Sequence, residues 1–107
     1  MTVTDTAPLG RAGPSSPTTV TLSGDIDVLT SAALRQDLLA TLRYSHSMLV
    51  LDLSQVSFCD ASGLAVLIGI QQRARAQGVT LVLAAPSPRV SRILHITGLD
   101  RKLPMMA

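Results

Sequence analysis

The 107-residue sequence has few aromatic residues and a single cysteine. Tyr44 and Phe58 are its only aromatic residues, and Trp is absent. Proteins that stack nucleic-acid bases rely on aromatic side chains, so we expect no nucleic-acid partner. The small formal net charge of +2 supports the same expectation. Because Cys59 is the only cysteine, the chain can form neither an internal disulfide nor a cysteine-based zinc site.

Long apolar runs and nucleotide-binding motifs are also absent. No strongly apolar run approaches the roughly 20 residues that a membrane-spanning helix needs. The N-terminus lacks the basic and then apolar segments of a signal peptide. We therefore expect a cytoplasmic protein without a membrane partner. The glycines do not have the spacing of a phosphate-binding loop or a dinucleotide fingerprint, and we expect no cofactor.

What the sequence does contain is enough aliphatic residues for one buried core. Apolar residues make up 47% of the chain, which suits a single globular domain. Residues 1–17 predict a weak first strand over Thr2–Thr6 and then a flexible loop rich in Pro, Gly and Ser. The signal for a folded domain covers residues 18–107.

From residue 18 onward, strand and helix patterns alternate. The first strand pattern runs from residue 18 to Gly24 and is followed by a polar turn at Asp25–Asp27. Further strand patterns cover residues 48–53, 79–85 and 101–105, and the last of these is expected at an edge of the sheet. The first helix pattern begins near an N-cap at Thr30 and places one stripe inward: Leu34, Leu38, Thr41 and Leu42. The last helix pattern follows an N-cap at Ser87, ends at Gly98 and buries Val90, Ile93, Leu94 and Thr97. This order predicts an α/β domain with a mixed, mostly parallel sheet and helices packed on it.

The central helix pattern, from Leu64 to Ala76, follows a polar segment that contains a glycine. Helix starts present unpaired N–H groups and favour negative charge, so a phosphate or an acidic partner surface would suit this position. One stripe of the helix should be buried: Leu64, Leu67, Ile68, Gln71 and Ala74. The opposite face is small and nearly flat: Ala61, Ala65, Gly69, Gln72, Arg73 and Ala76.

Three aspartates and two potential nucleophiles in the sequence are candidates for a site near this helix. For each of them, a structural role is an alternative to metal binding or catalysis. Asp25, Asp27 and Asp60 would bind a divalent ion if their loops met. Turn and N-cap roles are favoured over metal, and for Asp27 a solvated, partner-facing role is equally plausible. Ser62 lacks the Gly-x-Ser-x-Gly frame of a hydrolase, and Cys59 lacks a phosphate-cradling arginine. We therefore expect no enzymatic activity.

Four blocks in order resemble the STAS domain, and most closely the bacterial anti-sigma-factor antagonists. The first is Gly24-Asp25-Ile26-Asp27 with the following helix, and the second is Leu51-Asp52-Leu53 continuing to Phe58. The third is Asp60-x-Ser62-Gly63-Leu64. The fourth is Pro86-x-Pro88-Arg89-Val90 with Ile93-x-x-Ile96-Thr97-Gly98-Leu99. Together they span residues 18 to about 103.

The resemblance implies a protein that binds an anti-sigma factor with a histidine-kinase-like ATPase fold and so releases a sigma factor. It also implies a phosphorylation switch at the residue directly after the motif aspartate. That residue is Ala61, which has no hydroxyl to phosphorylate. Two versions stay open: docking that is independent of phosphorylation, or Ser62 as the substitute acceptor. The structural alternative for Ser62 is a hydroxyl that bonds backbone near the helix start.

The expected partner-binding residues are Asp25, Asp27, Asp60, Ala61, Ser62, Gly63, Ala65 and Gly69. The alternative function is a non-catalytic STAS scaffold, or a module that senses an anion or nucleotide at the Ser62–Gly63 amides. The resemblance also implies a further helix after the last strand, which this sequence lacks. We therefore expect Leu103, Met105 and Met106 to be exposed or to pack against another copy in a homodimer.

Overall fold

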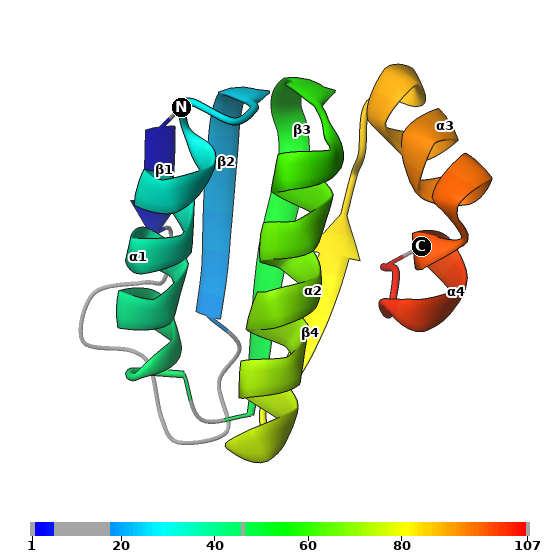
Figure 1. Ribbon diagram of the computed structural model, residues 1–107. Coiled ribbons are helices and arrows are strands. Elements are labelled where there is room, and N and C mark those ends of the chain that lie inside the picture. Colours follow the sequence, from blue (N-terminus) through cyan, green and yellow to red (C-terminus); the bar gives the residue numbers. More distant parts are fainter. Residues whose placement is uncertain (1, 6–17, 46, 107) are drawn as a thin grey trace.

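The computed structural model describes residues 2–5, 18–45 and 47–106. These residues form a four-stranded sheet and four helices (Figure 1). The strands lie in the order β1-β2-β3-β4, with β1 antiparallel to β2 and the other two pairs parallel. The elements are β1 (Thr2–Asp5), β2 (Thr18–Ile26), α1 (Ser31–Leu42), β3 (Met48–Cys59), α2 (Ala61–Ala76), β4 (Thr80–Ala84), α3 (Pro88–Thr97) and α4 (Leu99–Lys102).

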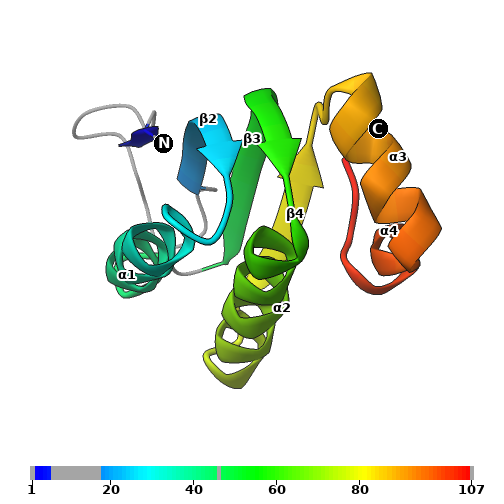
Figure 2. The ribbon, with the colours of Figure 1, turned by 45° about the horizontal axis from the view of Figure 1, so that its top comes forward.

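Helices α1 and α2 lie side by side on one face of the sheet, whereas α3 and α4 lie beyond the β4 edge (Figures 1 and 2). This arrangement confirms the predicted α/β domain with a mixed, mostly parallel sheet. The flexible loop that was predicted after the first strand, within residues 1–17, lies outside the described residues. No helix in the described ranges is long and apolar enough to cross a bilayer.

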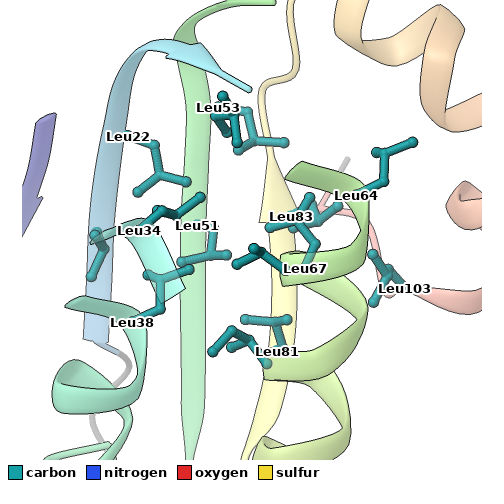
Figure 3. Close-up of a cluster of buried hydrophobic side chains, with 14 of the residues drawn as sticks. Leu22, Leu34, Leu38, Leu51, Leu53, Leu64, Leu67, Leu81, Leu83 and Leu103 are labelled. Carbon is teal, nitrogen blue, oxygen red and sulfur yellow. The ribbon is translucent and has the colours of Figure 1, made fainter. Parts of the chain in front are cut away.

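The core fills the space between the sheet and the two helices. Leu22, Leu51 and Leu83 project from three neighbouring strands, and Leu34 and Leu67 meet them from α1 and α2 (Figure 3). All five side chains are fully or almost fully buried. Burial of each contributes about 1.5–3 kcal/mol, so this leucine layer is a substantial part of what holds the helices on the sheet.

Strands β2 and β3 both extend beyond their predicted ends. Gly24 does not end β2, which continues to Ile26, and β3 continues past Leu53 to Cys59. The register between them shifts twice, between Thr21 and Ser23 and between Gly24 and Asp25. Each shift sets an extra β3 residue against β2, as in a β-bulge. The bulges break the two-residue alternation, which is why the sequence pattern did not reveal the second half of β3.

Helix α2 presents the predicted small face to the outside. Its six members are all exposed: Ala61, Ala65, Gly69, Gln72, Arg73 and Ala76. The predicted inner stripe is partly wrong, because Ile68 and Gln71 are half-buried while Val66 and Ile70 are buried. The buried arc is centred nearer to Val66 and Ile70, since α2 contacts both α1 and the sheet.

The chain after β4 differs most from its prediction. Ser87 caps α3 as expected, since its Oγ accepts a hydrogen bond from the Val90 N–H at 3.3 Å. Gly98 ends α3 with φ of 78°, a left-handed conformation that glycine adopts without strain. The chain then forms α4 in place of the predicted strand over 101–105, of which a single parallel bridge between Leu83 and Met105 remains.

Two further burial predictions need correction at this end of the molecule. Leu103, expected to be exposed, is 1% exposed and belongs to the core beside α2 (Figure 3). Met105 is half-buried, and Met106 alone is exposed among the three. Thr97, predicted to be buried, is exposed, and its hydroxyl donates to the Ile93 carbonyl at 2.8 Å. The apolar patch that suggested a homodimer is therefore largely internal.

Candidate docking surface at the start of helix α2

Asp60 joins the end of β3 to the start of α2. Its Oδ1 atom accepts hydrogen bonds from the backbone N–H groups of Ser62 at 2.8 Å and Gly63 at 3.2 Å. Its own N–H donates to the Ile26 carbonyl at 3.0 Å, which ties the ends of β2 and β3 together. The carboxylate is thus an N-cap placed at the positive end of the helix dipole. It already occupies the amides that an external anion would need.

Gly63 lets α2 approach the two strand ends. A Cβ built at this position would lie 2.5 Å from Ile26 Cγ2 and 2.7 Å from Cys59 Sγ, closer than real side-chain carbons come. Gly63 is buried, so its contacts are within the domain rather than at the surface. By contrast, a Cβ on Gly69 would meet no atom within 4 Å, because that residue lies on the open, small face.

Cys59 has the environment of an unreactive thiol. Its side chain is 2% exposed and lies in the core. Burial, aided by the neighbouring Asp60 carboxylate, raises the pKa of the Cys59 thiol from 9.0 to about 11. A thiolate nucleophile is therefore almost absent at neutral pH, which agrees with a structural role for this residue.

The loop between β2 and α1 is built on Asp27. Its Oδ1 accepts from the N–H groups of Leu29 at 2.9 Å and Thr30 at 3.1 Å. Thr30 Oγ1 in turn accepts from the Asp27 N–H at 3.0 Å and donates to the Asp25 carbonyl at 3.0 Å. Thr30 precedes α1 as predicted but makes no side-chain bond to the helix amides. Asp27 provides the side-chain hydrogen bonds that a helix cap usually makes.

Two apolar residues of this loop project into solvent. Val28 is 71% exposed and Leu29 is 87% exposed. Phe58, which pairs with Asp25 across β2 and β3, is 38% exposed. Exposed large apolar side chains that gather at one end of a molecule mark an interaction site. The sequence did hold a signal for the loop pair, since Val28-Leu29 interrupts a polar turn and belongs to no periodic stripe.

We define the α2-start surface by the residues that surround this end of the sheet. The β2–α1 loop and the first turns of α2 lie at the same end of the molecule (Figures 1 and 2). The members that are exposed or half-buried are Asp25, Asp27, Val28, Leu29, Phe58, Asp60, Ala61, Ser62, Ala65 and Gly69. The structure thus gathers six of the eight predicted partner-binding residues at one end, places Gly69 about halfway along the exposed face of α2, and buries Gly63.

Ser62 is half-buried in the first turn of α2. Its amide is held by Asp60, but its hydroxyl makes no hydrogen bond within the described part of the chain. Of the two histidines, His95 lies on α3, with Nδ1 3.0 Å from Asp100 Oδ2, and His46 is outside the described residues. In the described ranges, no three His, Cys, Asp or Glu side chains come close enough to hold a metal ion.

Comparisons with known proteins identify the family. A family model described as "Mlab, STAS domain" matches residues 9–106. An anti-sigma-B factor antagonist of Bacillus subtilis is 34% identical over 80 residues, which are 75% of this chain and 72% of that protein. An anti-sigma F factor antagonist of Paenibacillus polymyxa is 32% identical over 87 residues, 80% of this chain and 74% of that protein.

A solved structure agrees with the sequence matches. The crystal structure of an anti-sigma factor antagonist from Mycobacterium paratuberculosis aligns with a TM-score of 0.74 at 30% identity, covering 97% of this chain and 85% of that one. The fold, a mixed sheet with two helices on one face, is therefore shared along nearly the whole chain. The chain belongs to the STAS domain family, as its four sequence blocks indicated.

Proposed function

We propose that this protein is an anti-sigma-factor antagonist that binds an anti-sigma factor through the α2-start surface. The observation that carries the proposal is the exposed Val28-Leu29 pair at the same end of the molecule as the start of α2. Small residues let a partner's backbone come close, and the apolar pair offers about 1.5–3 kcal/mol per side chain once buried. The names of the similar proteins support an anti-sigma factor as the partner.

The partner we propose has a histidine-kinase-like ATPase fold, and its binding frees a sigma factor for transcription. Such a partner would present basic groups toward Asp25 and Asp27 and an apolar recess for Leu29. Because sigma factors act in transcription, this function belongs to the cytoplasm. The protein contributes a binding surface rather than a catalytic group, since Cys59 is a buried thiol and the Asp60 carboxylate next to Ser62 caps α2.

Ala61 makes the proposed docking independent of phosphorylation at that position. Its side chain is exposed at the first turn of α2 and carries no oxygen. A phosphate here would add a charge of about −1.5 to −2 beside the Asp60 carboxylate. Without a hydroxyl, a partner kinase cannot switch the surface off at this residue. The proposed antagonist is therefore constitutively able to bind unless Ser62 takes the phosphate.

One experiment tests the proposal and separates its two versions. The purified protein is mixed with the anti-sigma factor, its sigma factor and ATP, and the released sigma factor is measured together with the mass of the antagonist. We expect release of the sigma factor without any phosphate on the antagonist. A stoichiometric phosphate that the Ser62→Ala variant abolishes would replace the constitutive version by a Ser62 switch. No release from any anti-sigma factor of the same organism would refute the proposed function.

The scaffold or anion-sensing alternative is less favoured by the site. The Ser62 and Gly63 amides, where an anion was expected to bind, donate to Asp60 Oδ1. An external anion at this position would have to displace a carboxylate of the same molecule and would meet its charge at short range.

A further inference from the structure

A cavity of about 330 Å³ lies at the far end of α2 from the α2-start surface. It is open to solvent and lies between the last turns of α2, the beginning of β4 and the segment around the end of α4, with a lining that includes Gln71, Arg75, Val79, Leu81, Lys102 and Pro104. At a rise of 1.5 Å per residue, Arg75 is about 20 Å along the helix from Ala61. The volume of the cavity is near the lower limit for cavities that hold small molecules.

The outer wall of this cavity is held in place by several interactions. Gln71 Nε2 donates to the Lys102 carbonyl at 2.8 Å, which links α2 to the end of α4. The next residue, Leu103, is buried in the core. Beyond it, the Leu83 N–H donates to the Pro104 carbonyl at 2.9 Å, so the segment is also bonded to β4. Hydrogen bonds to α2 and β4 therefore fix the position of the C-terminal segment that lines the cavity.

The charge around the cavity is positive. Arg75 and Lys102 are exposed on two of its walls, and neither forms an ion pair within the described ranges. The nearest acidic residue along the chain, Asp100, is bonded to His95. After Asp60 the sequence has six basic residues and one acidic one. The C-terminal end of α2 contributes only about half a negative charge, which two full positive charges outweigh.

The floor of the cavity is apolar. Val79 and Leu81, which line it, are 3% and 2% exposed, and Pro104 adds a further apolar side chain to the lining. Thr80, between them in sequence, is exposed and adds a hydroxyl to the lining. Among the described residues, no aromatic side chain lines the cavity, so it lacks a surface on which a nucleobase would stack. The chemistry that fits is an anionic group attached to a short aliphatic body.

We propose that this cavity binds a small organic anion whose carboxylate or phosphate lies between Arg75 and Lys102. The aliphatic part of the ligand contacts Val79, Leu81 and Pro104. Charge pairs that stay in contact with water contribute modestly, so we expect a dissociation constant of about 1 mM. This site is separate from the α2-start surface, and its existence does not depend on the proposed function.

The test is a titration of the ¹⁵N-labelled full chain, followed by amide chemical shifts at constant ionic strength. Butyrate and glycerol 3-phosphate are the two probes, and sodium chloride is the control. We expect saturable shifts at Gln71, Arg75, Thr80 and Lys102 with at least one probe, and the tighter probe identifies the anionic group. Shifts that rise linearly with both probes, or that chloride reproduces, would overturn the proposal.

Matched double variants separate a built site from a general effect of charge. Arg75→Gln with Lys102→Gln should weaken binding about tenfold or more, since both charged contacts are lost. Arg89→Gln with Arg92→Gln removes the same charge from exposed residues of α3 outside the cavity lining and should leave the affinity nearly unchanged. Equal weakening by the two pairs would show non-specific attraction and refute the site. Circular dichroism confirms that each variant is folded.

Discussion

At the scale of single residues, the α2-start surface depends on which atoms are missing. Gly63 has no Cβ, which lets α2 contact Ile26 and Cys59. The Ala61 side chain has no oxygen, so it cannot accept a phosphate. The first absence determines the packing of the helix start, and the second is the basis of the proposed docking without phosphorylation at this position. Each can be tested by adding back the missing atoms.

Gly63→Ala should destabilise the fold, because its Cβ would overlap with Ile26 Cγ2 and Cys59 Sγ. Overpacking of this kind costs about 1–3 kcal/mol in the free energy of unfolding. Gly69→Ala is the matched control on the same helix and should stabilise by about 0.5–1 kcal/mol, since its Cβ enters open space. Urea denaturation measures both values. Equal effects of the two variants would contradict the close approach at Gly63.

Ala61→Ser should create a phosphate acceptor at the exposed first turn of α2. With the partner kinase and ATP, we expect the variant to gain one phosphate and to lose affinity by about a hundredfold or more, through charge placed beside Asp60. Intact-mass measurement and a binding titration report the two effects. Ala61→Gln, a larger neutral residue, controls for size. A phosphorylated variant that still binds at full strength would show that the partner does not cover this turn.

Cys59 gives the protein a pH-dependent contribution to stability. Its pKa rises from 9.0 in the unfolded chain to about 11 in the fold, so the folded state prefers the protonated thiol. This contribution is complete below pH 9.0 and is lost as the pH rises toward 11. We expect Cys59→Ala to lack this alkaline loss in a series of urea denaturations. Near neutral pH, the native thiol should react with iodoacetamide much more slowly than the unfolded one.

At the scale of secondary-structure elements, the β2–α1 loop and the segment after α4 differ most from a simple alternation of strands and helices. The loop holds two apolar residues outward by means of the Asp27 hydrogen bonds. The C-terminal segment instead turns Leu103 inward. The same class of side chain is therefore exposed to solvent in one element and packed in the core in the other.

Val28→Asp should weaken binding of the anti-sigma factor by about tenfold to a hundredfold, because it replaces an apolar contact by a charge that docking would bury. Ile96→Asp is a matched control: Ile96 on α3 is 72% exposed, against 71% for Val28. We expect the control to bind normally. Equal losses in a surface plasmon resonance titration would show that the partner does not use the β2–α1 loop.

Leu103→Ala should lower the free energy of unfolding by about 2–5 kcal/mol, the range for truncating a buried leucine. Met106→Ala, at a position 47% exposed, should change it by less than about 0.5 kcal/mol. Chemical denaturation compares the two variants. A small effect at Leu103 would contradict its place in the core.

At the scale of the whole molecule, the burial of Leu103 changes the expected oligomeric state. In the C-terminal segment, where a dimer contact was expected, Met106 alone offers far less apolar surface than a stable dimer buries. We therefore expect a monomer, whose radius of gyration in small-angle scattering is close to the Cα value of 12.8 Å. Met106→Ser should leave it unchanged. A radius that grows with protein concentration would show self-association through another surface.

Much of the fold followed from the sequence, because short-range patterns indicated its elements. Leu34, Leu38 and Leu42 recur at helical spacing and are all fully buried. Ser87 and Gly98 correctly predict the two ends of α3. The second half of β3 did not follow, since two bulges remove its alternation. The strand predicted at 101–105 was wrong because Gly98 allows the chain to turn directly into α4.

The candidate site was predicted in its polar residues and missed in its apolar ones. Asp60, Ala61 and Ser62 belong to a motif that can be recognised without coordinates. Val28 and Leu29 interrupt a polar turn and belong to no helix stripe, but this pattern does not say whether the pair is buried or exposed. The exposure of both residues depends on where the Asp27 hydrogen bonds direct the loop.

The sequence alone determined the order of the elements from β2 to α3, the family and the absence of a hydroxyl at Ala61. These features depend on residue identity and on spacing along the chain. Only the tertiary structure showed that Gly63 contacts Ile26, that Leu103 is core, and that Arg75 and Lys102 line one cavity. These contacts are between residues that are distant in sequence. The proximity of such residues depends on how the helices pack on the sheet.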